Sequence, residues 1–97
     1  MRQNDLSYDK IVYMQTPYFL WDYDLTDKQI HAILKGKNEV EKRWMMGRIL
    51  THAHYQDIFK YLTIADIVRY FSKLSLPPTV KSAWQRALEV WGYHVQP

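Results

Sequence analysis

The sequence predicts an all-α fold, a small single-domain bundle of four to five helices with an aromatic N-terminal arm. Three observations carry this prediction: two capping-box spacings, helical periodicity of the apolar residues, and glycine or proline at the ends of the periodic segments. A chain of 97 residues with 47% hydrophobic residues can bury one modest core. We therefore expect one helical domain over residues 18–97, preceded by an arm over residues 1–17.

The arm begins with polar residues and continues with the apolar stretch Ile11–Met14, which Thr16 and Pro17 stop. This pattern is typical of a short strand or of a flexible segment that orders on a partner. Residues 18–23 follow as a run that is too short and too aromatic for an amphipathic helix.

The first long helix is predicted to start at Thr26. Thr26 and Gln29 have the spacing of a capping box, and Leu25 and Ile30 stand at the positions of a hydrophobic staple. Gly36 is expected to end this helix.

The second helix is predicted to start at Asn38 and to run to about His54. At about 100° per residue, Val40 and Trp44 point away from its core stripe. Neighbours on both sides could cover the helix, or Trp44 could anchor another molecule; we favour the first interpretation. The core stripe consists of Met45, Met46, Ile49, Leu50 and Ala53.

Three further helices complete the prediction. Residues 55–62 suit a short helix, and Thr63 with Asp66 forms a second capping box. Pro77 and Pro78 open the last helix, because proline is tolerated in a first turn, and Gly92 ends it. The buried stripes are expected to be Ile64, Ile67, Val68, Phe71 and Leu74 in one helix and Val80, Trp84, Ala87, Leu88 and Trp91 in the other.

The segment Asp22-Tyr23-Asp24-Leu25-Thr26 resembles the nucleophile loop of haloacid-dehalogenase-type phosphatases, in which paired aspartates act near Mg²⁺. That fold needs a parallel sheet, whereas this chain is predicted to be helical after Thr26. Asp22 and Asp24 instead precede a helix N-terminus, where the helix dipole favours carboxylates. We predict no catalytic residues and a protein that is not an enzyme.

No metal or cofactor is expected. His52 and His54 are two residues apart, which places them about 200° apart on a helix, whereas helical metal pairs need three or four. The absence of cysteine removes thiolate ligands and disulfides and fits a cytoplasmic protein. No apolar run approaches the roughly 20 residues of a membrane helix.

A helix-turn-helix DNA-binding regulator is one functional alternative, because the net charge of +3 permits contact with nucleic acid. In the last helix Lys81, Gln85 and Arg86 are the candidate nucleic-acid contacts. The connection over residues 72–78 is longer than the usual turn of this motif, which disfavours it. A basic patch for nonspecific phosphate contact is also conceivable, although Glu39, Glu41 and Asp57 dilute it; its members are Lys42, Arg43, Arg48 and Lys60.

The aromatic run after Pro17 favours a protein-binding function. Aromatic residues make up 15% of the chain, and large rings with polar tips dominate interface hot spots. The alternative is that the same rings close the helical core. The candidate protein-binding residues are Tyr18, Phe19, Trp21, Asp22, Tyr23, Asp24 and Trp44.

Residues 18–91 also resemble a family of small bacterial proteins of uncharacterised function. The resemblance implies an antitoxin or accessory role, because such proteins are often encoded beside nucleotidyltransferase-like toxins of the abortive-infection (AbiE) type. It assigns no catalytic or binding residue and does not cover the arm. The segments that carry it are Phe19–Thr26, Gly47–Leu50 with Ala53, Asp57–Thr63, Ala83–Trp84, Ala87–Leu88 and Trp91.

The sequence therefore predicts a protein-binding antitoxin or accessory partner of a nucleotidyltransferase-type toxin. The expected mechanism is steric: Trp21 and Tyr23 anchor the aromatic segment over the nucleotide cleft of the toxin. Asp22 and Asp24 are expected to meet basic groups that otherwise hold phosphates.

Overall fold

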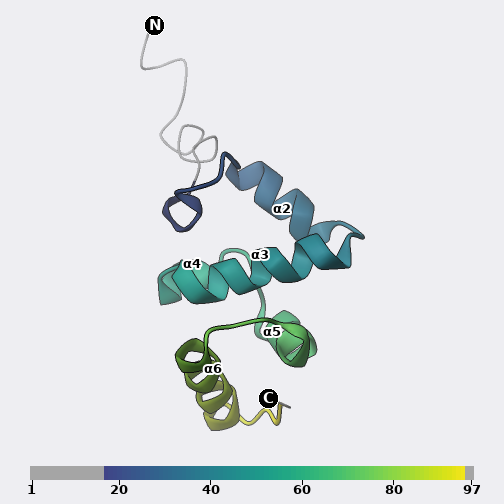
Figure 1. Cartoon of the computed structure of the whole chain (residues 1–97). Coiled ribbons are helices and arrows are strands. Elements are labelled where there is room, and N and C mark those ends of the chain that lie inside the picture. Colours follow the sequence, from purple (N-terminus) through teal and green to yellow (C-terminus); the bar gives the residue numbers. More distant parts are fainter. Residues whose placement is uncertain (1–16, 96–97) are drawn as a thin grey trace, which may run out of the picture.

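The computed structural model describes residues 17–95 and confirms the all-α prediction (Figure 1). This part of the chain contains five α-helices, two 3₁₀ turns and no strand. The predicted arm lies outside the described residues, apart from Pro17. The elements are η2 (Tyr18–Leu20), α2 (Asp27–Lys35), α3 (Glu39–His52), α4 (Tyr55–Ile58), α5 (Ile64–Tyr70), η3 (Phe71–Lys73) and α6 (Pro78–Val90).

The helix starts follow the predicted caps. At α2 the Gln29 amide donates to Thr26 Oγ1 (3.3 Å), and the Thr26 amide donates to Gln29 Oε1 (2.8 Å). At α5 Thr63 and Asp66 make the same reciprocal pair, with both distances 3.0 Å. Both capping boxes are therefore confirmed, and each satisfies helix amides that have no intrahelical partner.

Helix α3 lies in the middle of the molecule. In Figure 1, α2 and η2 lie on one side of it, and α5 and α6 lie on the other. Its predicted stripe is buried, apart from the half-buried Ala53. The buried core consists of Phe19, Leu20, Ile30, Met45, Met46, Ile49, Leu50, Ile58, Leu62, Ile67, Tyr70, Phe71, Leu74, Trp84 and Leu88.

Helix α3 has neighbours on two sides, but they do not cover the residues that suggested this arrangement. Val40 is 70% exposed and Trp44 is 38% exposed. The preferred interpretation, in which neighbouring elements bury both side chains, is therefore wrong. In the loop after η2, the Tyr23 ring meets the Trp44 indole in a T-shaped arrangement.

Several predicted boundaries shift in the structure. Helix α3 ends at His52, and α4 ends at Ile58. The predicted stripe that begins at Ile64 continues from α5 into the 3₁₀ turn η3. Helix α6 begins at Pro78 as predicted, and Gly92 follows it with φ +95°. Trp91, which was predicted on the buried face, is 38% exposed because α6 ends one residue before it.

No helix within residues 17–95 is long and apolar enough to cross a membrane.

Candidate functional site

Arg48 connects α3 to the loop that follows η2. Its Nε donates to the backbone carbonyl of Phe19 at 2.9 Å, and its terminal nitrogen forms an ion pair with the Asp22 carboxylate. The Arg48 side chain is largely buried, whereas Asp22 is about half exposed. This arginine therefore fixes the start of the aromatic segment against the central helix.

Aromatic rings surround the Arg48 guanidinium. Its central carbon lies 4.4 Å from the centroid of the Trp21 ring and 5.4 Å from that of Tyr23. Each of these rings also meets a side chain of α3 edge-on at 4.9 Å, Trp21 against His52 and Tyr23 against Trp44. We call these five residues (Trp21, Tyr23, Trp44, Arg48 and His52) the Arg48 cluster.

The rings of the Arg48 cluster are held in place and still face solvent. Trp21 is 65% exposed and Tyr23 is 45% exposed. A cation–π contact at an exposed site contributes about 0.5–1 kcal/mol, which restrains a ring without burying it. Rigid, exposed Trp and Tyr side chains are typical anchors of protein interfaces.

The structure divides the other residues of the predicted protein-binding set. Phe19 is only 1% exposed and belongs to the core, so we leave it out of the binding surface. Asp24 is exposed, but Asp22 is engaged by Arg48, which disfavours its expected role of meeting basic groups on a partner. The run therefore serves both of the alternatives weighed from the sequence: Phe19 and Leu20 belong to the core, whereas Tyr18, Trp21 and Tyr23 are exposed at the surface.

Tyr18 attaches η2 to α4 through its hydroxyl. The hydroxyl donates to Asp57 Oδ2 at 2.6 Å and accepts from the His54 amide at 2.5 Å. Partial burial and the Asp57 contact raise the pKa of Tyr18, and the hydrogen bond from Tyr18 lowers the pKa of Asp57. Tyr18 thus positions the segment, although half of its surface remains exposed.

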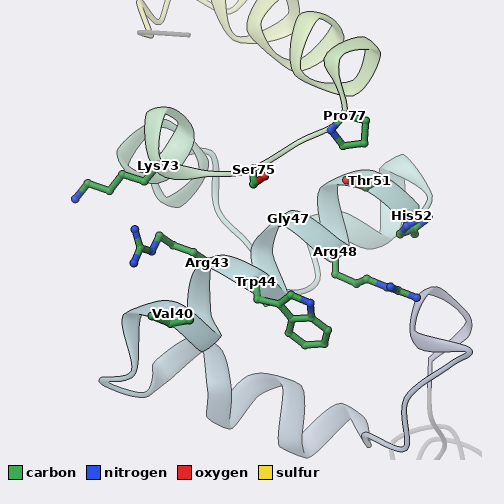
Figure 2. Close-up of a pocket in the computed structure, with 10 residues that line it drawn as sticks. All are labelled: Val40, Arg43, Trp44, Gly47, Arg48, Thr51, His52, Lys73, Ser75 and Pro77. Carbon is green, nitrogen blue, oxygen red and sulfur yellow. The ribbon is translucent and has the colours of Figure 1, made fainter.

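A surface pocket of about 440 Å³ adjoins the Arg48 cluster (Figure 2). It lies between α3 and the chain from η3 to the start of α6. Figure 2 shows Lys73 and Arg43 at one end, Trp44 next to them, and Arg48 with His52 at the other end. The pocket is therefore both cationic and aromatic.

Only two of the four residues of the predicted basic patch, Arg43 and Arg48, line the pocket. Lys42 pairs with Glu39 and Lys60 pairs with Asp57, each within one helical turn. Arg43 instead lines the pocket together with Lys73, which is 30 residues further along the chain. The sequence analysis did not include Lys73 among the candidate residues, because no local pattern connects it to Arg43.

A second aromatic group lies between α4 and α6. The sequence analysis did not predict it. Tyr55 and Phe59 meet edge-on at 5.3 Å, and both lie near Trp84, with ring centroids 6.4 Å away. The four members, Tyr55, Phe59, Trp84 and Trp91, were assigned separately to short-helix or core positions in the sequence.

The candidate nucleic-acid contacts lie apart from the Arg48 cluster. Lys81 and Gln85 are half-buried on α6, and Arg86 is exposed. Figure 1 places α6 on the side of α3 opposite α2 and η2. Among residues 17–95, no three His, Asp or Glu side chains are grouped so that they could hold a metal ion.

Together these features define a small all-helical protein with an exposed cation–aromatic surface beside a cationic pocket. Comparison of the chain with protein-family models, with curated proteins and with solved structures finds no match.

Proposed function

We propose that the protein is a non-enzymatic, cytoplasmic binding partner, an antitoxin or accessory protein, of a nucleotidyltransferase-type toxin. The observation that carries the binding role is the exposure of Trp21 and Tyr23 on a loop held by Arg48. The class of the partner comes from the resemblance of residues 18–91 to proteins encoded beside such toxins.

The proposed mechanism is steric occlusion of the nucleotide cleft of the toxin. Trp21, Tyr23 and Trp44 insert as preorganised rings, so little side-chain freedom is lost on binding. Asp24, which is exposed, supplies the carboxylate that meets basic groups of the toxin. Asp22 acts indirectly, because its ion pair with Arg48 holds the loop.

The first experiment identifies the partner. The tagged protein is used for a nuclease-treated pull-down from the native host, with mass spectrometry of the bound proteins. Stoichiometric recovery of a nucleotidyltransferase supports the proposal. Recovery of nucleic acid alone, and only when nuclease is omitted, contradicts it and favours the DNA-binding alternative.

The second experiment tests the surface. Trp21→Ala and Tyr23→Ala should each weaken toxin binding by about 2 kcal/mol or more, which is roughly 30-fold in Kd, because both rings are expected hot spots. Isothermal titration calorimetry measures the affinity. Tyr55→Ala and Trp91→Ala are matched controls, since they remove an exposed Tyr and an exposed Trp from the other aromatic group. Undiminished binding of folded Trp21 and Tyr23 variants would exclude this surface.

One observation favours the helix-turn-helix alternative. When the 3₁₀ turn η3 is counted with α5, the connection to α6 has four residues, Leu74–Pro77, which is within the usual length of that turn, although the α-helices themselves are seven residues apart. Phosphate-driven binding weakens steeply as ionic strength rises. A duplex that binds at low salt through Lys81 and Arg86 would therefore support a regulator, and no shift at low salt would dismiss it.

A further inference from the structure

The pocket beside the Arg48 cluster has the charge of an anion site. Three cationic side chains line it, Arg43, Arg48 and Lys73, and none of the described residues that line it is acidic. Its volume of about 440 Å³ lies within the range of about 300–1,000 Å³ for small-molecule sites.

Two of these cations have no carboxylate partner among the described residues, and Lys73 Nζ lies 5.9 Å from the centroid of the Tyr70 ring. Arg48 is neutralised by Asp22, whereas Arg43 and Lys73 form no ion pair with any described residue. Arg43 uses its Nε to donate to the Glu39 carbonyl at 3.2 Å, which leaves its terminal nitrogens for another acceptor. In Figure 2 both cationic side chains lie at the same end of the pocket. Two neighbouring positive charges favour a ligand with at least two negative charges, such as a phosphate.

Trp44 lines the same pocket, and Figure 2 shows its indole between the Arg43 end and the Arg48 end. Trp44 is 38% exposed although it contacts Tyr23, so part of its indole remains accessible. Planar bases stack on such rings, and the gain is largely independent of the base. Thr51 and Ser75 add hydroxyl groups to the lining, and hydroxyls commonly hydrogen-bond phosphate and sugar oxygens.

We propose that this pocket binds a nucleoside phosphate, with the phosphate at Arg43 and Lys73 and the base against Trp44. The ligand is either a free nucleotide or the end of a single-stranded nucleic acid, which share this chemistry. The combination of paired cations with an adjoining exposed indole favours a nucleoside phosphate over an inorganic anion. Binding of this ligand needs no toxin, so it can be tested separately from the proposed function, although both use Trp44.

The test uses the isolated protein with three probes: adenosine triphosphate, inorganic phosphate, and a short single-stranded oligothymidylate. Calorimetry at low salt should show that adenosine triphosphate binds more tightly than inorganic phosphate. Tighter binding of the oligothymidylate than of adenosine triphosphate identifies single-stranded nucleic acid as the source, and the reverse order identifies the free nucleotide. Failure of both nucleotide probes to bind overturns the proposal.

Variants then separate charge from stacking. The Arg43→Gln/Lys73→Gln pair should lower the affinity for adenosine triphosphate at least tenfold. Trp44→Ala should lower it about fivefold or more, the range of a lost stacking contact, and should leave weak binding of inorganic phosphate unchanged. The control pair Lys28→Gln/Arg69→Gln removes the same charge from exposed positions on α2 and α5. An equal loss in the control pair, or no effect of Trp44→Ala, would contradict the site.

Discussion

Arg48 shows how one side chain defines a surface. It satisfies the Phe19 carbonyl, neutralises Asp22 and stacks beside two rings at the same time. A lysine could not replace it, because the planar fork of arginine makes several directed hydrogen bonds while its face packs on aromatic rings. The exposed rings are thus held by a largely buried cation.

Tyr18 and Asp57 predict a dependence of stability on pH. The Tyr18 hydrogen bond lowers the pKa of Asp57 in the folded protein, and the Tyr70 hydroxyl, 3.0 Å from Glu39 Oε1, lowers the pKa of Glu39. A lowered folded-state pKa stabilises the protein above the unfolded pKa of about 4, and this stabilisation is lost as the pH falls through the folded pKa. Urea midpoints should therefore decrease below about pH 4.

The substitution Tyr18→Phe tests whether the Tyr18 hydrogen bond lowers the pKa of Asp57. It should lower the free energy of unfolding at neutral pH by about 1–3 kcal/mol, as expected for the two hydrogen bonds of its hydroxyl, and should flatten the acid dependence. Tyr93→Phe is the control, because Tyr93 is exposed and its hydroxyl has no hydrogen-bond partner among the described residues. The same acid dependence in Tyr18→Phe and in the unsubstituted protein would argue against this role of Asp57.

At the scale of elements, α3 is the helix on which the others are arranged. Its capped start and buried stripe follow from the sequence, but it carries a glycine in its interior, Gly47, which lowers helix stability. The segment before α6 passes close to this glycine and forms one wall of the pocket.

Gly47→Ala should stabilise the protein by about 0.5–1 kcal/mol. An added Cβ would lie 3.7 Å from the Ser75 carbonyl oxygen and 3.8 Å from Leu76 Cδ2, which are ordinary contact distances. Gly92→Ala provides the opposite case: it should destabilise by about 1 kcal/mol or more, because Gly92 has φ +95°. Urea denaturation followed by circular dichroism measures both, and a destabilised Gly47→Ala variant would show that the segment at Ser75 cannot accept the methyl group.

At the scale of the whole molecule, Trp84 joins the last helix to the centre. Its indole nitrogen donates to the Leu50 carbonyl of α3 at 3.4 Å, and its side chain is buried between α6 and the rest of the core. It is also the buried member of the second aromatic group, and the exposed rings of Tyr55, Phe59 and Trp91 lie near it.

Trp84→Ala should lower the free energy of unfolding by about 3–5 kcal/mol, because it leaves a large cavity. Trp91→Ala should have a much smaller effect, since that side chain is partly exposed at the end of α6. Denaturant titration compares the two variants. Equal losses would mean that α6 is held by its C-terminal end rather than by Trp84.

The sequence by itself determined the local structure of this protein: the helical class, the two capping boxes, the start of α6 and most of the buried stripes. These features depend on residues three or four positions apart, whose interactions recur wherever a helix forms. Only the tertiary structure decided that Phe19 is buried while Trp21 is exposed, that Arg48 holds Asp22, and that Lys73 lines the same pocket as Arg43. These pairings join residues that are 26 or more positions apart, and they arise from how the helices pack on α3 rather than from any local spacing.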